Sequence, residues 1–261
     1  MQQLLIDAGN SRLKFALLRE GRLARTRSVA WSVRPAGGAD AAARQIMAGV
    51  RGAQRILVCN VAGAGIERAL RRAARAARAP APLFIRSARR AAGVRNGYRE
   101  TWRLGADRWV ALIGARALLP RRALCVVDVG TALTIDLIDA AGVHRGGLLV
   151  PGPALMIEAL LRQTAGIRRR AGAPPRRRNA AALTVFARNT RAGLIAGAEL
   201  AAAALIERAM QEARALLGRR PQLLLAGGGA GPVASRLRTP TRRADDLVLR
   251  GLGVLAAGDS G

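Results

Sequence analysis

Two stretches with the same layout decide the fold: DAGNSRLKFALL at residues 7–18 and DVGTALTIDLID at residues 128–139. Each follows a short apolar run typical of a strand. Each then begins with an aspartate, has a glycine two residues later and a small polar residue after it, and continues as a second strand-like run. Such an internal repeat predicts two similar lobes, each presenting an aspartate and a glycine-containing turn at a strand tip. A ligand held between the two tips is the natural expectation.

The remaining pattern alternates strand-like and helical segments, which predicts an α/β fold with mixed sheets flanked by helices. Strands are expected at 55–61, 83–86 and 123–128, and helices at 40–50, 66–79, 104–119 and 189–217. A glycine turn is expected at 146–147, and a basic proline-containing loop at 168–178. We predict two domains, residues 1–119 and residues 120–261. Helix 66–79 is expected to present its arginines as a solvated face.

The charge of the chain is strongly positive, with 44 Lys and Arg residues against 16 Asp and Glu residues. Such an excess suggests a polyanionic partner. However, Lys14 is the only lysine, and so lopsided a preference for arginine suggests a bias in codon usage. The sequence also has no recognisable nucleic-acid-binding module. We therefore expect salt-sensitive sticking to nucleic acid but no specific nucleic-acid partner.

The two cysteines, Cys59 and Cys125, each lie beside an apolar run and have no metal-ligand spacing around them. They are expected to be buried and reduced. The chain begins directly with an apolar strand, without the pattern of a signal peptide, and no apolar stretch reaches the ~18 residues that span a bilayer. These features predict a soluble cytoplasmic protein without membrane association.

The first turn has the residue types of a phosphate site. Gly9 permits close approach of backbone N–H donors, and Asn10 and Ser11 add side-chain donors. Asp7 can hold the Mg²⁺ that bridges nucleotide phosphates. Lys14 lies just beyond the turn, where its ammonium can reach a transferring phosphoryl group. An ordinary hairpin with one exposed lysine would explain this turn if it stood alone.

The second turn repeats these features with Asp128, Gly130 and Thr131, which makes coincidence a poor explanation. A third glycine-rich element, 226–230, could let an adenine or ribose lie against bare backbone, although glycines often end strands. Asp107 opens a helix, where it can act as an N-terminal cap or as the base that accepts a hydroxyl proton. The neighbouring Arg108 can bind a substrate carboxylate.

Taken together and in this order, the motifs resemble those of type III pantothenate kinases, a bacterial branch of the acetate and sugar kinase, Hsp70 and actin superfamily. DAGNSRLK matches the family's first phosphate motif, LGADRW its pantothenate motif and DVGTALTID its second phosphate motif. GGLLVPGPALM, the RNT of residues 188–190 and LVLRGL near the C-terminus also fit. The resemblance spans nearly the whole chain and implies two actin-like (ribonuclease H-like) lobes with a ligand cleft between them.

The resemblance also implies roles for individual residues. Asp107 would be the general base, and Asp128 would hold a monovalent cation, K⁺ or NH₄⁺. The following residues would bind ATP and its Mg²⁺: Asp7, Ala8, Gly9, Asn10, Ser11, Arg12, Leu13, Lys14 and Thr131. The following residues would contact pantothenate: Tyr98, Gly105, Ala106, Asp107, Arg108 and Thr190. A homodimer is also implied.

The chain departs from the family pattern in three places. Ser11 replaces the commoner threonine but keeps the hydroxyl, residues 164–168 replace the usual Thr-Ala-x-Leu-Pro stretch, and 226–231 lack the usual aspartate after the late glycines. These changes leave the phosphate motifs intact and affect the adenosine side and the substrate lid. His144, the only histidine, is expected in a hairpin turn with a structural role or none.

The expected reaction is transfer of the γ-phosphate of ATP to the 4′-hydroxyl of pantothenate, the first step of coenzyme A synthesis. One alternative is another kinase or phosphatase of the same superfamily that acts on a sugar or acyl phosphate; the GADR motif with Tyr98 argues against it. The other alternative is a regulatory or nucleic-acid-binding accessory protein, which the positive charge supports weakly.

Overall fold

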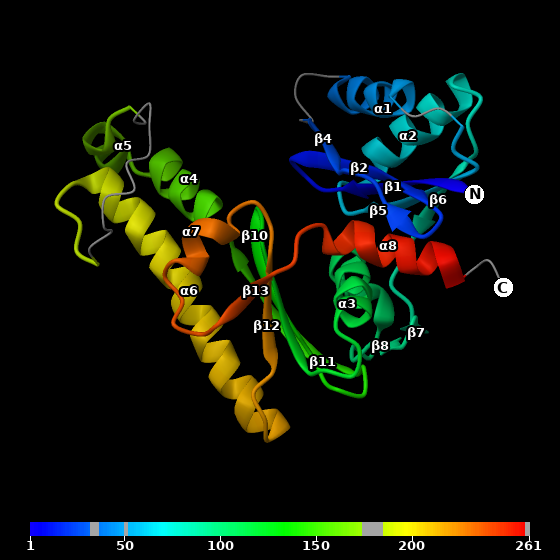
Figure 1. Ribbon diagram of the computed structural model, residues 1–261. Helices are drawn as coiled ribbons and strands as arrows, with labels where there is room; N and C mark the ends of the chain where they lie inside the picture. The colour runs from blue at the N-terminus through cyan, green and yellow to red at the C-terminus, as the bar shows by residue number, and fades with distance from the viewer. Residues whose placement is uncertain (32–36, 50–51, 174–184, 259–261) are drawn as a thin grey trace. The chain divides into compact units, whose positions relative to one another are not determined.

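The computed structural model describes residues 1–31, 37–49, 52–173 and 185–258, and the chain divides into two compact units. Unit 1 comprises Met1–Leu124, Ile138–Gly146 and Asp246–Gly261, and unit 2 comprises Cys125–Leu137 and Gly147–Asp245. The chain therefore returns to unit 1 twice, whereas a single division at 119/120 would place the C-terminal segment in the second domain. The expected α/β architecture is confirmed (Figure 1).

The main sheet of unit 1 is mixed, with the strand order β3-β2-β1-β5-β6, and β4 pairs with β2. Its strands are β1 (Gln2–Ala8), β2 (Arg12–Arg19), β3 (Arg22–Leu23), β4 (Arg27–Ala30), β5 (Arg55–Asn60) and β6 (Pro82–Ile85). β1 runs antiparallel to β2 and parallel to β5, so Asp7 lies opposite both Lys14 and Cys59. The short strands β3 and β4 were not predicted, because residues 22–30 lack an apolar alternation.

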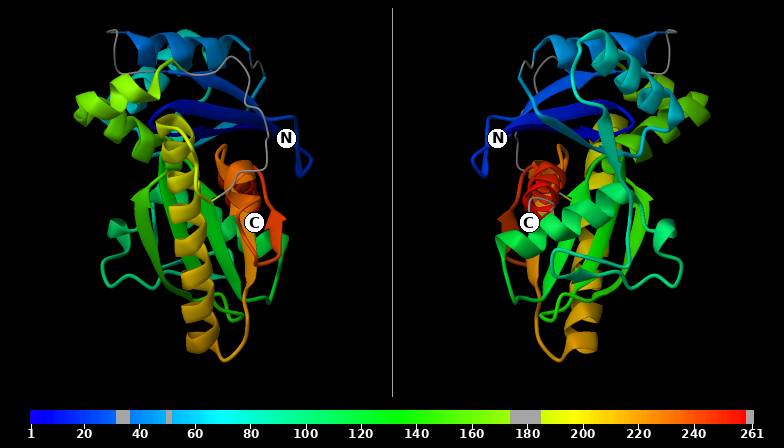
Figure 2. Two further views of the ribbon diagram at one scale, coloured as in Figure 1. Left: turned by 90° about the vertical axis from the view of Figure 1, so that its left-hand side faces the viewer. Right: turned by 90° about the vertical axis from the view of Figure 1, so that its right-hand side faces the viewer.

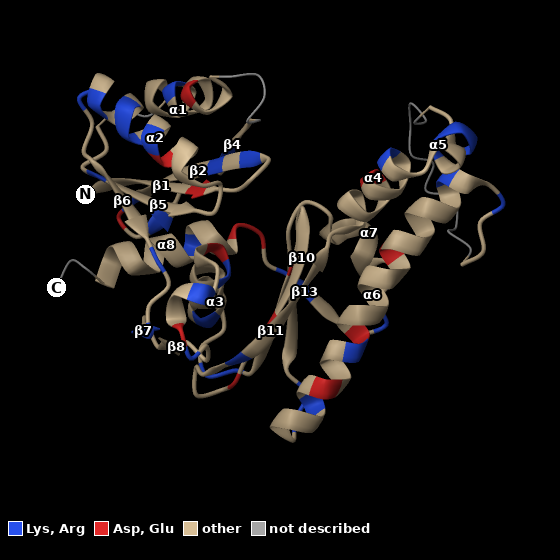
Figure 3. Ribbon diagram, turned by 180° about the vertical axis from the view of Figure 1, so that it is seen from behind, with Lys and Arg blue, Asp and Glu red and all other residues tan. Residues whose placement is uncertain are grey.

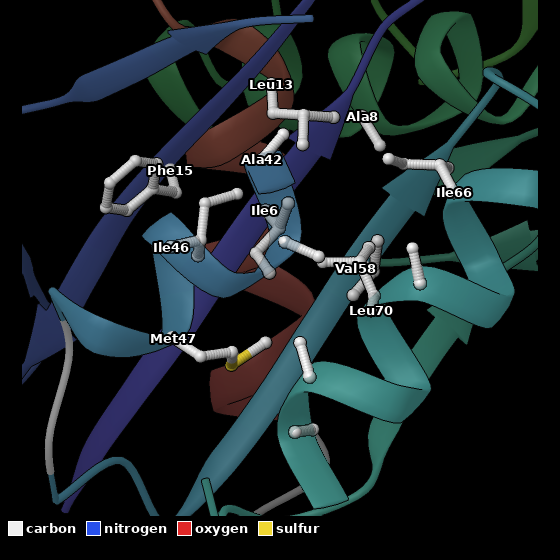
Figure 4. Close-up of a cluster of buried hydrophobic side chains, with 14 of the residues drawn as sticks. Ile6, Ala8, Leu13, Phe15, Ala42, Ile46, Met47, Val58, Ile66 and Leu70 are labelled. Atoms are coloured by element: carbon white, nitrogen blue, oxygen red, sulfur yellow. The ribbon is translucent and has the colours of Figure 1, made fainter. Parts of the chain in front are cut away.

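Alternate residues of β1 point to two different cores, as the two-residue period of a strand requires. Leu4, Ile6 and Ala8 pack under α1 (Gly38–Ala48) and α2 (Ala64–Ala76), on the face of the sheet shown in Figure 4. On the opposite face, α8 (Leu247–Gly258) approaches Leu5 at Gly253. α3 (Ala106–Leu118) packs beside α8 and contacts β5.

The helices α3 and α8 are in contact through glycine. A Cβ added at Gly114 of α3 would overlap the carbonyl oxygen of Leu247, and one added at Gly251 of α8 would overlap that of Val110. Only residues without a side chain allow the two backbones to come this close. This contact joins the C-terminal helix to the helix that begins with the GADR motif.

Helix α2 is amphipathic, as expected from its sequence. Ile66, Leu70 and several alanines are buried, whereas the arginines of this helix, whose positions are blue in Figure 3, are exposed. Arg71 pairs with Glu67 and lies over the ring of Phe84, and Arg72 pairs with Asp40. The prediction of a solvated arginine face is confirmed.

A small hairpin and a single turn of 3-10 helix lead into α3. The hairpin consists of β7 (Arg90–Ala91) and β8 (Val94–Arg95), and the 3-10 helix is η1 (Thr101–Arg103). Arg95 forms a parallel bridge with Val143, and its N–H donates to the carbonyl oxygen of Gly142. The segment before α3 is thereby joined to residues 142–143 of the same unit.

The second sheet has the strand order β11-β10-β9-β12-β13. Its strands are β9 (Leu124–Val129), β10 (Ala132–Ile138), β11 (His144–Pro151), β12 (Gln222–Ala226) and β13 (Thr241–Arg243). The long helix α6 (Thr190–Leu217) runs along this sheet (Figure 2), and with α7 (Ala230–Ala234) it buries Cys125, Val127 and Leu225. Two further helices, α4 (Pro153–Gln163) and α5 (Ala165–Ala171), contact each other and α6.

Three predicted local features differ from the structure. Gly146 and Gly147 lie within β11 rather than in a turn. Gly146 has a φ of 120° within this strand, a value that glycine readily adopts. Residues 168–171 belong to α5 rather than to a loop, since arginine and alanine favour helix. The rest of that segment, from 174 onward, lies outside the described residues. His144 begins β11 and is buried rather than lying in a hairpin turn.

Both cysteines are free thiols in buried strand positions, as predicted. Burial and the negative charge of Asp136 raise the pKa of Cys125 to about 12. Within the described ranges, no helix is both long enough and apolar enough to cross a bilayer.

We predict that Gly251→Ala lowers the free energy of unfolding by at least about 1–3 kcal/mol, because its methyl group would overlap the backbone of α3. Gly197→Ala is the matched control, since a Cβ at this exposed helical position meets no atom within 4 Å. There the better helix propensity of alanine should leave stability equal or slightly higher. Urea denaturation of the two variants makes the comparison, and equal midpoints would contradict the close contact.

Candidate functional site

The first turn, residues 9–11, joins β1 to β2 and is held from several sides. Gly9 N–H donates to the Arg12 carbonyl oxygen at 3.1 Å, and Trp31 Nε1 donates to the Gly9 carbonyl oxygen at 2.8 Å. Val61 N–H donates to the Ala8 carbonyl oxygen just before the turn. Asn10 and Ser11 are exposed at its tip. The turn is thus a fixed backbone structure with accessible polar side chains, which suits the binding of phosphate oxygens.

Lys14 lies opposite Asp7 on β2 and forms an ion pair with Asp246 at 3.5 Å. The other carboxylate oxygen of Asp246 accepts a hydrogen bond from Thr26 Oγ1 at 2.7 Å. Asp246 precedes α8 and has a φ of 59°, in the left-handed region that non-glycine residues seldom adopt. The sole lysine therefore has an oriented acidic neighbour. The sequence analysis missed Asp246, because it is distant in the chain and no motif pointed to it.

Asp107 is in the first turn of α3, where a carboxylate interacts favourably with the helix dipole. Its Oδ1 accepts a hydrogen bond from Arg108 N–H at 2.8 Å. A Cβ at Gly105 would lie only 2.7 Å from the same oxygen. The glycine of GADR therefore makes room for the carboxylate of Asp107.

Cys59 lies on β5, which pairs with β1 and contacts α3. This buried thiol lies opposite Asp7 in the register of β1 and β5. Burial raises its pKa well above the usual value, and the negative charges of Asp7 and then Asp107 raise it further. The strand of Cys59 thus lies next to the strand that carries Asp7 and contacts the helix that carries Asp107. Cys59 carries no motif, so the sequence analysis did not connect it with the site.

Tyr98 and Arg108 form the second part of the site in unit 1. Arg108 is only 6% exposed, its Nη1 lies 3.2 Å from Tyr98 Oη, and its guanidinium carbon lies 5.8 Å from the centre of the tyrosine ring. Gly105, Ala106 and Asp107, at the start of α3, are partly exposed beside the buried arginine. All of the predicted pantothenate contacts except Thr190 therefore lie within unit 1.

The second turn, in unit 2, is also built around a glycine. Gly130 N–H donates to the Ala132 carbonyl oxygen at 3.0 Å, as Gly9 N–H does to Arg12 in the first turn. Only residues 130–131 separate β9 from β10, so this turn is one residue shorter than the first. Gly152 N–H donates to the Thr131 carbonyl oxygen at 2.8 Å. The GGLLVPG segment thus supports the second phosphate motif directly.

The glycines of the element 226–230 lie against the same turn. Gly229 N–H donates to the Val129 carbonyl oxygen at 2.9 Å. A Cβ at Gly227, which has a φ of 91°, would overlap Asp128 Oδ1 and approach Val129. The structure thus brings Asp128, Thr131 and the element 226–230 together within unit 2.

Thr190 is the first residue of α6, and Asn189 caps this helix by accepting a hydrogen bond from Ala192 N–H at 2.8 Å. Thr190 belongs to unit 2, whereas Tyr98 and Asp107 belong to unit 1. That the two groups face one cleft stays a prediction. Among the described residues, no group of three or more His, Cys, Asp or Glu side chains is arranged to bind a metal.

Several solved structures have folds similar to that of this chain. A 2-dehydro-3-deoxygalactonokinase from Sinorhizobium meliloti matches with a TM-score of 0.58 and 16% identity, covering 99% of this chain and 98% of the other. A Baf family transcriptional activator from Campylobacter jejuni also gives 0.58, at 20% identity and with coverage of 99% and 100%. A ROK family glucokinase from Streptomyces griseus, solved with glucose and AMPPNP, gives 0.54 at 11% identity, covering 99% and 100%. These likenesses show that the chain shares its fold with these proteins.

Sequence comparison gives the family. The family model for type III pantothenate kinase matches residues 3–212. A type III pantothenate kinase from Aromatoleum aromaticum is 40% identical over 263 residues, covering 98% of each chain. Another, from Herminiimonas arsenicoxydans, is 39% identical over 264 residues, covering 97% of this chain and 96% of the other. The chain belongs to the type III pantothenate kinase family, and the resemblance of its motifs to that family is confirmed.

We predict that Gly227→Ala destabilises unit 2 by at least about 2 kcal/mol, because alanine disfavours the left-handed φ and its methyl group would overlap Asp128. Gly228→Ala is the matched control: its φ is not positive, and an added Cβ meets no atom within 4 Å. Thermal unfolding should separate the two variants. Equal losses of stability would show that Gly227 is not pressed against the second turn.

Proposed function

We propose that the chain transfers the γ-phosphate of ATP to the 4′-hydroxyl of pantothenate, using Asp7–Lys14 and Asp107 in unit 1. The observation that supports this assignment is that the two motifs lie in one compact unit: β5 pairs with the strand that carries Asp7 and contacts α3, the helix that carries Asp107. A metal-holding carboxylate and a base must lie near one another for in-line phosphoryl transfer, since the phosphate and the hydroxyl meet between them. Membership of the family supplies the substrates, ATP with a divalent metal and pantothenate.

The first turn would bind the phosphates of ATP. Gly9 to Ser11 offer backbone and side-chain donors, and Asp7 would hold Mg²⁺ directly or through water. Lys14 would leave its half-exposed pair with Asp246 for the transferring phosphoryl group. In this reading Asp246 keeps the ammonium oriented until the nucleotide arrives.

Asp107 would accept the proton of the attacking hydroxyl. The transition state of phosphoryl transfer is usually loose, so the proton leaves late and a weak base is sufficient. The hydrogen bond from Arg108 N–H to Oδ1 fixes the orientation of the carboxylate. Gly105 keeps the space beside it free of a side chain.

Arg108 would bind the carboxylate of pantothenate, because a guanidinium matches a carboxylate in shape and charge. Tyr98, Gly105 and Ala106 would line the same pocket, and Thr190 would complete it from unit 2. Burial of Arg108 favours this role, since removal from water strengthens the pairing of opposite charges.

Asp128 and Thr131 would serve the nucleotide from unit 2, with a monovalent cation, K⁺ or NH₄⁺, held by Asp128. The donor set fits such an ion, because Asp128 Oδ1 and the Val129 carbonyl oxygen both lie beside the space that a Cβ of Gly227 would fill. A bound cation would offset phosphate charge. Thr131 would contact ATP.

We predict that Asp107→Asn lowers kcat about 100-fold or more, because the amide cannot accept the proton. The KM for pantothenate should change little. The assay couples ADP release to NADH oxidation in potassium buffer, and a sodium buffer should abolish turnover in the wild type. Asp40→Asn is the control, since this carboxylate pairs with Arg72 on α2 and should leave turnover intact. An Asp107→Asn enzyme with more than a tenth of wild-type kcat would refute the assignment.

We further propose that the protein acts as a cytoplasmic homodimer. Four leucines on the consecutive elements β11 and α4 are exposed: Leu148, Leu149, Leu155 and Leu160. Exposed apolar side chains on two consecutive elements are available for an interface.

The dimer is tested by substitution at Leu149, which is 57% exposed. Leu149→Asp should shift the mass measured by light scattering from that of a dimer to that of a monomer, because a buried charge would oppose association. Leu216→Asp is the matched control at an exposed leucine elsewhere in unit 2, and it should remain dimeric. A wild-type protein that is monomeric at micromolar concentration would contradict the proposal.

A further inference from the structure

His144 is the one histidine of the chain and belongs to no motif, yet its ring stacks on Tyr98. The ring centres lie 5.7 Å apart with an interplanar angle of 21°, and His144 is only 1% exposed. Both residues lie within unit 1, because residues 138–146 belong to it. The stack therefore rests on contacts inside one compact unit.

The tyrosine is held at its backbone as well as at its ring. Tyr98 N–H donates to Asn96 Oδ1 at 2.9 Å, and Asn96 Nδ2 donates to the Thr101 carbonyl oxygen. A Cβ at Gly97 would overlap the His144 carbonyl oxygen, so the loop before Tyr98 lies directly on the start of β11. The histidine ring thus packs against one face of the Tyr98 ring, and the loop fixes the position of the Tyr98 backbone.

The segment that presents His144 is itself rigid. Asp139 Oδ1 accepts hydrogen bonds from Ala141 N–H and Val143 N–H, and Oδ2 accepts one from Arg145 Nε at 2.7 Å. Burial alone would raise the pKa of Asp139, but these hydrogen bonds outweigh it and lower the pKa. The residues on both sides of His144 are thereby anchored to one carboxylate.

On its far side, Tyr98 reaches Arg108 through its hydroxyl oxygen, 3.2 Å from Nη1. His144, Tyr98 and Arg108 therefore form a row from β11 to the first turn of α3. A tyrosine ring without a neighbour on one face can rotate about its side-chain torsions, and the guanidinium would then lose an oriented partner. Through these contacts, the anchored segment around His144 fixes the position of Arg108, which is proposed to bind the substrate.

We infer that His144 is a positioning residue for pantothenate: it holds the Tyr98 ring, and through it Arg108, in the geometry that binds the substrate carboxylate. This inference rests on the proposed roles of Tyr98 and Arg108. It extends the site by a residue that does not touch the substrate. The histidine would act on substrate binding rather than on the phosphoryl-transfer step, because Asp107 is oriented separately by Gly105 and by the backbone of Arg108.

The test compares His144→Phe with His144→Leu. Both fill the buried space and both remove the ring nitrogens, but only phenylalanine keeps a flat ring under Tyr98. An aromatic stack of this kind is worth about 2- to 12-fold in an equilibrium constant. His144→Leu should therefore raise the KM for pantothenate about 5- to 10-fold above that of His144→Phe. The kcat and the KM for ATP should be the same in the two variants.

A double-mutant cycle separates positioning from a general loss of structure. In a Tyr98→Leu background the ring stack is absent, so phenylalanine and leucine at 144 should give the same KM. The inference would be overturned if the phenylalanine and leucine variants at 144 had equal KM values for pantothenate in the presence of Tyr98. It would also be overturned if their KM values still differed in the Tyr98→Leu background. In both cases, turnover of pantothenate by the wild type would still uphold the proposed function. Absence of wild-type turnover would overturn both.

Discussion

The register of β1 between its two neighbours is the constraint on which the site depends. Pairing with β2 places Lys14 opposite Asp7, and pairing with β5 places Cys59 beside the same aspartate. Because successive side chains of a strand point to opposite faces, a slip of one residue would turn Asp7 into the core beneath α1 and α2. The buried residues Leu4, Ile6 and Ala8 prevent that slip, since they would have to leave the same core. Apolar packing on one face thus determines where the acidic group lies on the other.

Four glycines serve a common purpose in the two units, which is to let backbone or carboxylate groups come close. Gly105 gives space to Asp107, and Gly227 gives space to Asp128. Gly114 and Gly251 do the same for two helices. In a chain with so few aromatic residues, close backbone contact compensates for the lack of bulky side chains in the core.

Sequence reasoning recovered the features that depend on local pattern. The strands on either side of the first turn, the amphipathic helix α2 and the long helix α6 all follow from their apolar periodicity. The two turns were visible because aspartate and glycine recur at one spacing. Partners distant in the chain were not visible: Asp246 beside Lys14 and His144 beneath Tyr98 arise only from the fold. β11 was missed in part because its glycine pair is typical of turns.

The return of the C-terminal segment to unit 1 has a consequence for how the protein forms in the cell. Helix α8 packs against α3 and β1, yet it follows all of unit 2 in the chain. During synthesis, the apolar side chains of α3 that α8 covers stay exposed until all of unit 2 has been translated. Such exposed apolar surface favours aggregation. Unit 1 can therefore complete its fold only after unit 2 has been translated. A truncation of even a few C-terminal turns would leave the GADR helix without its cover, although no residue of the proposed chemistry would be missing.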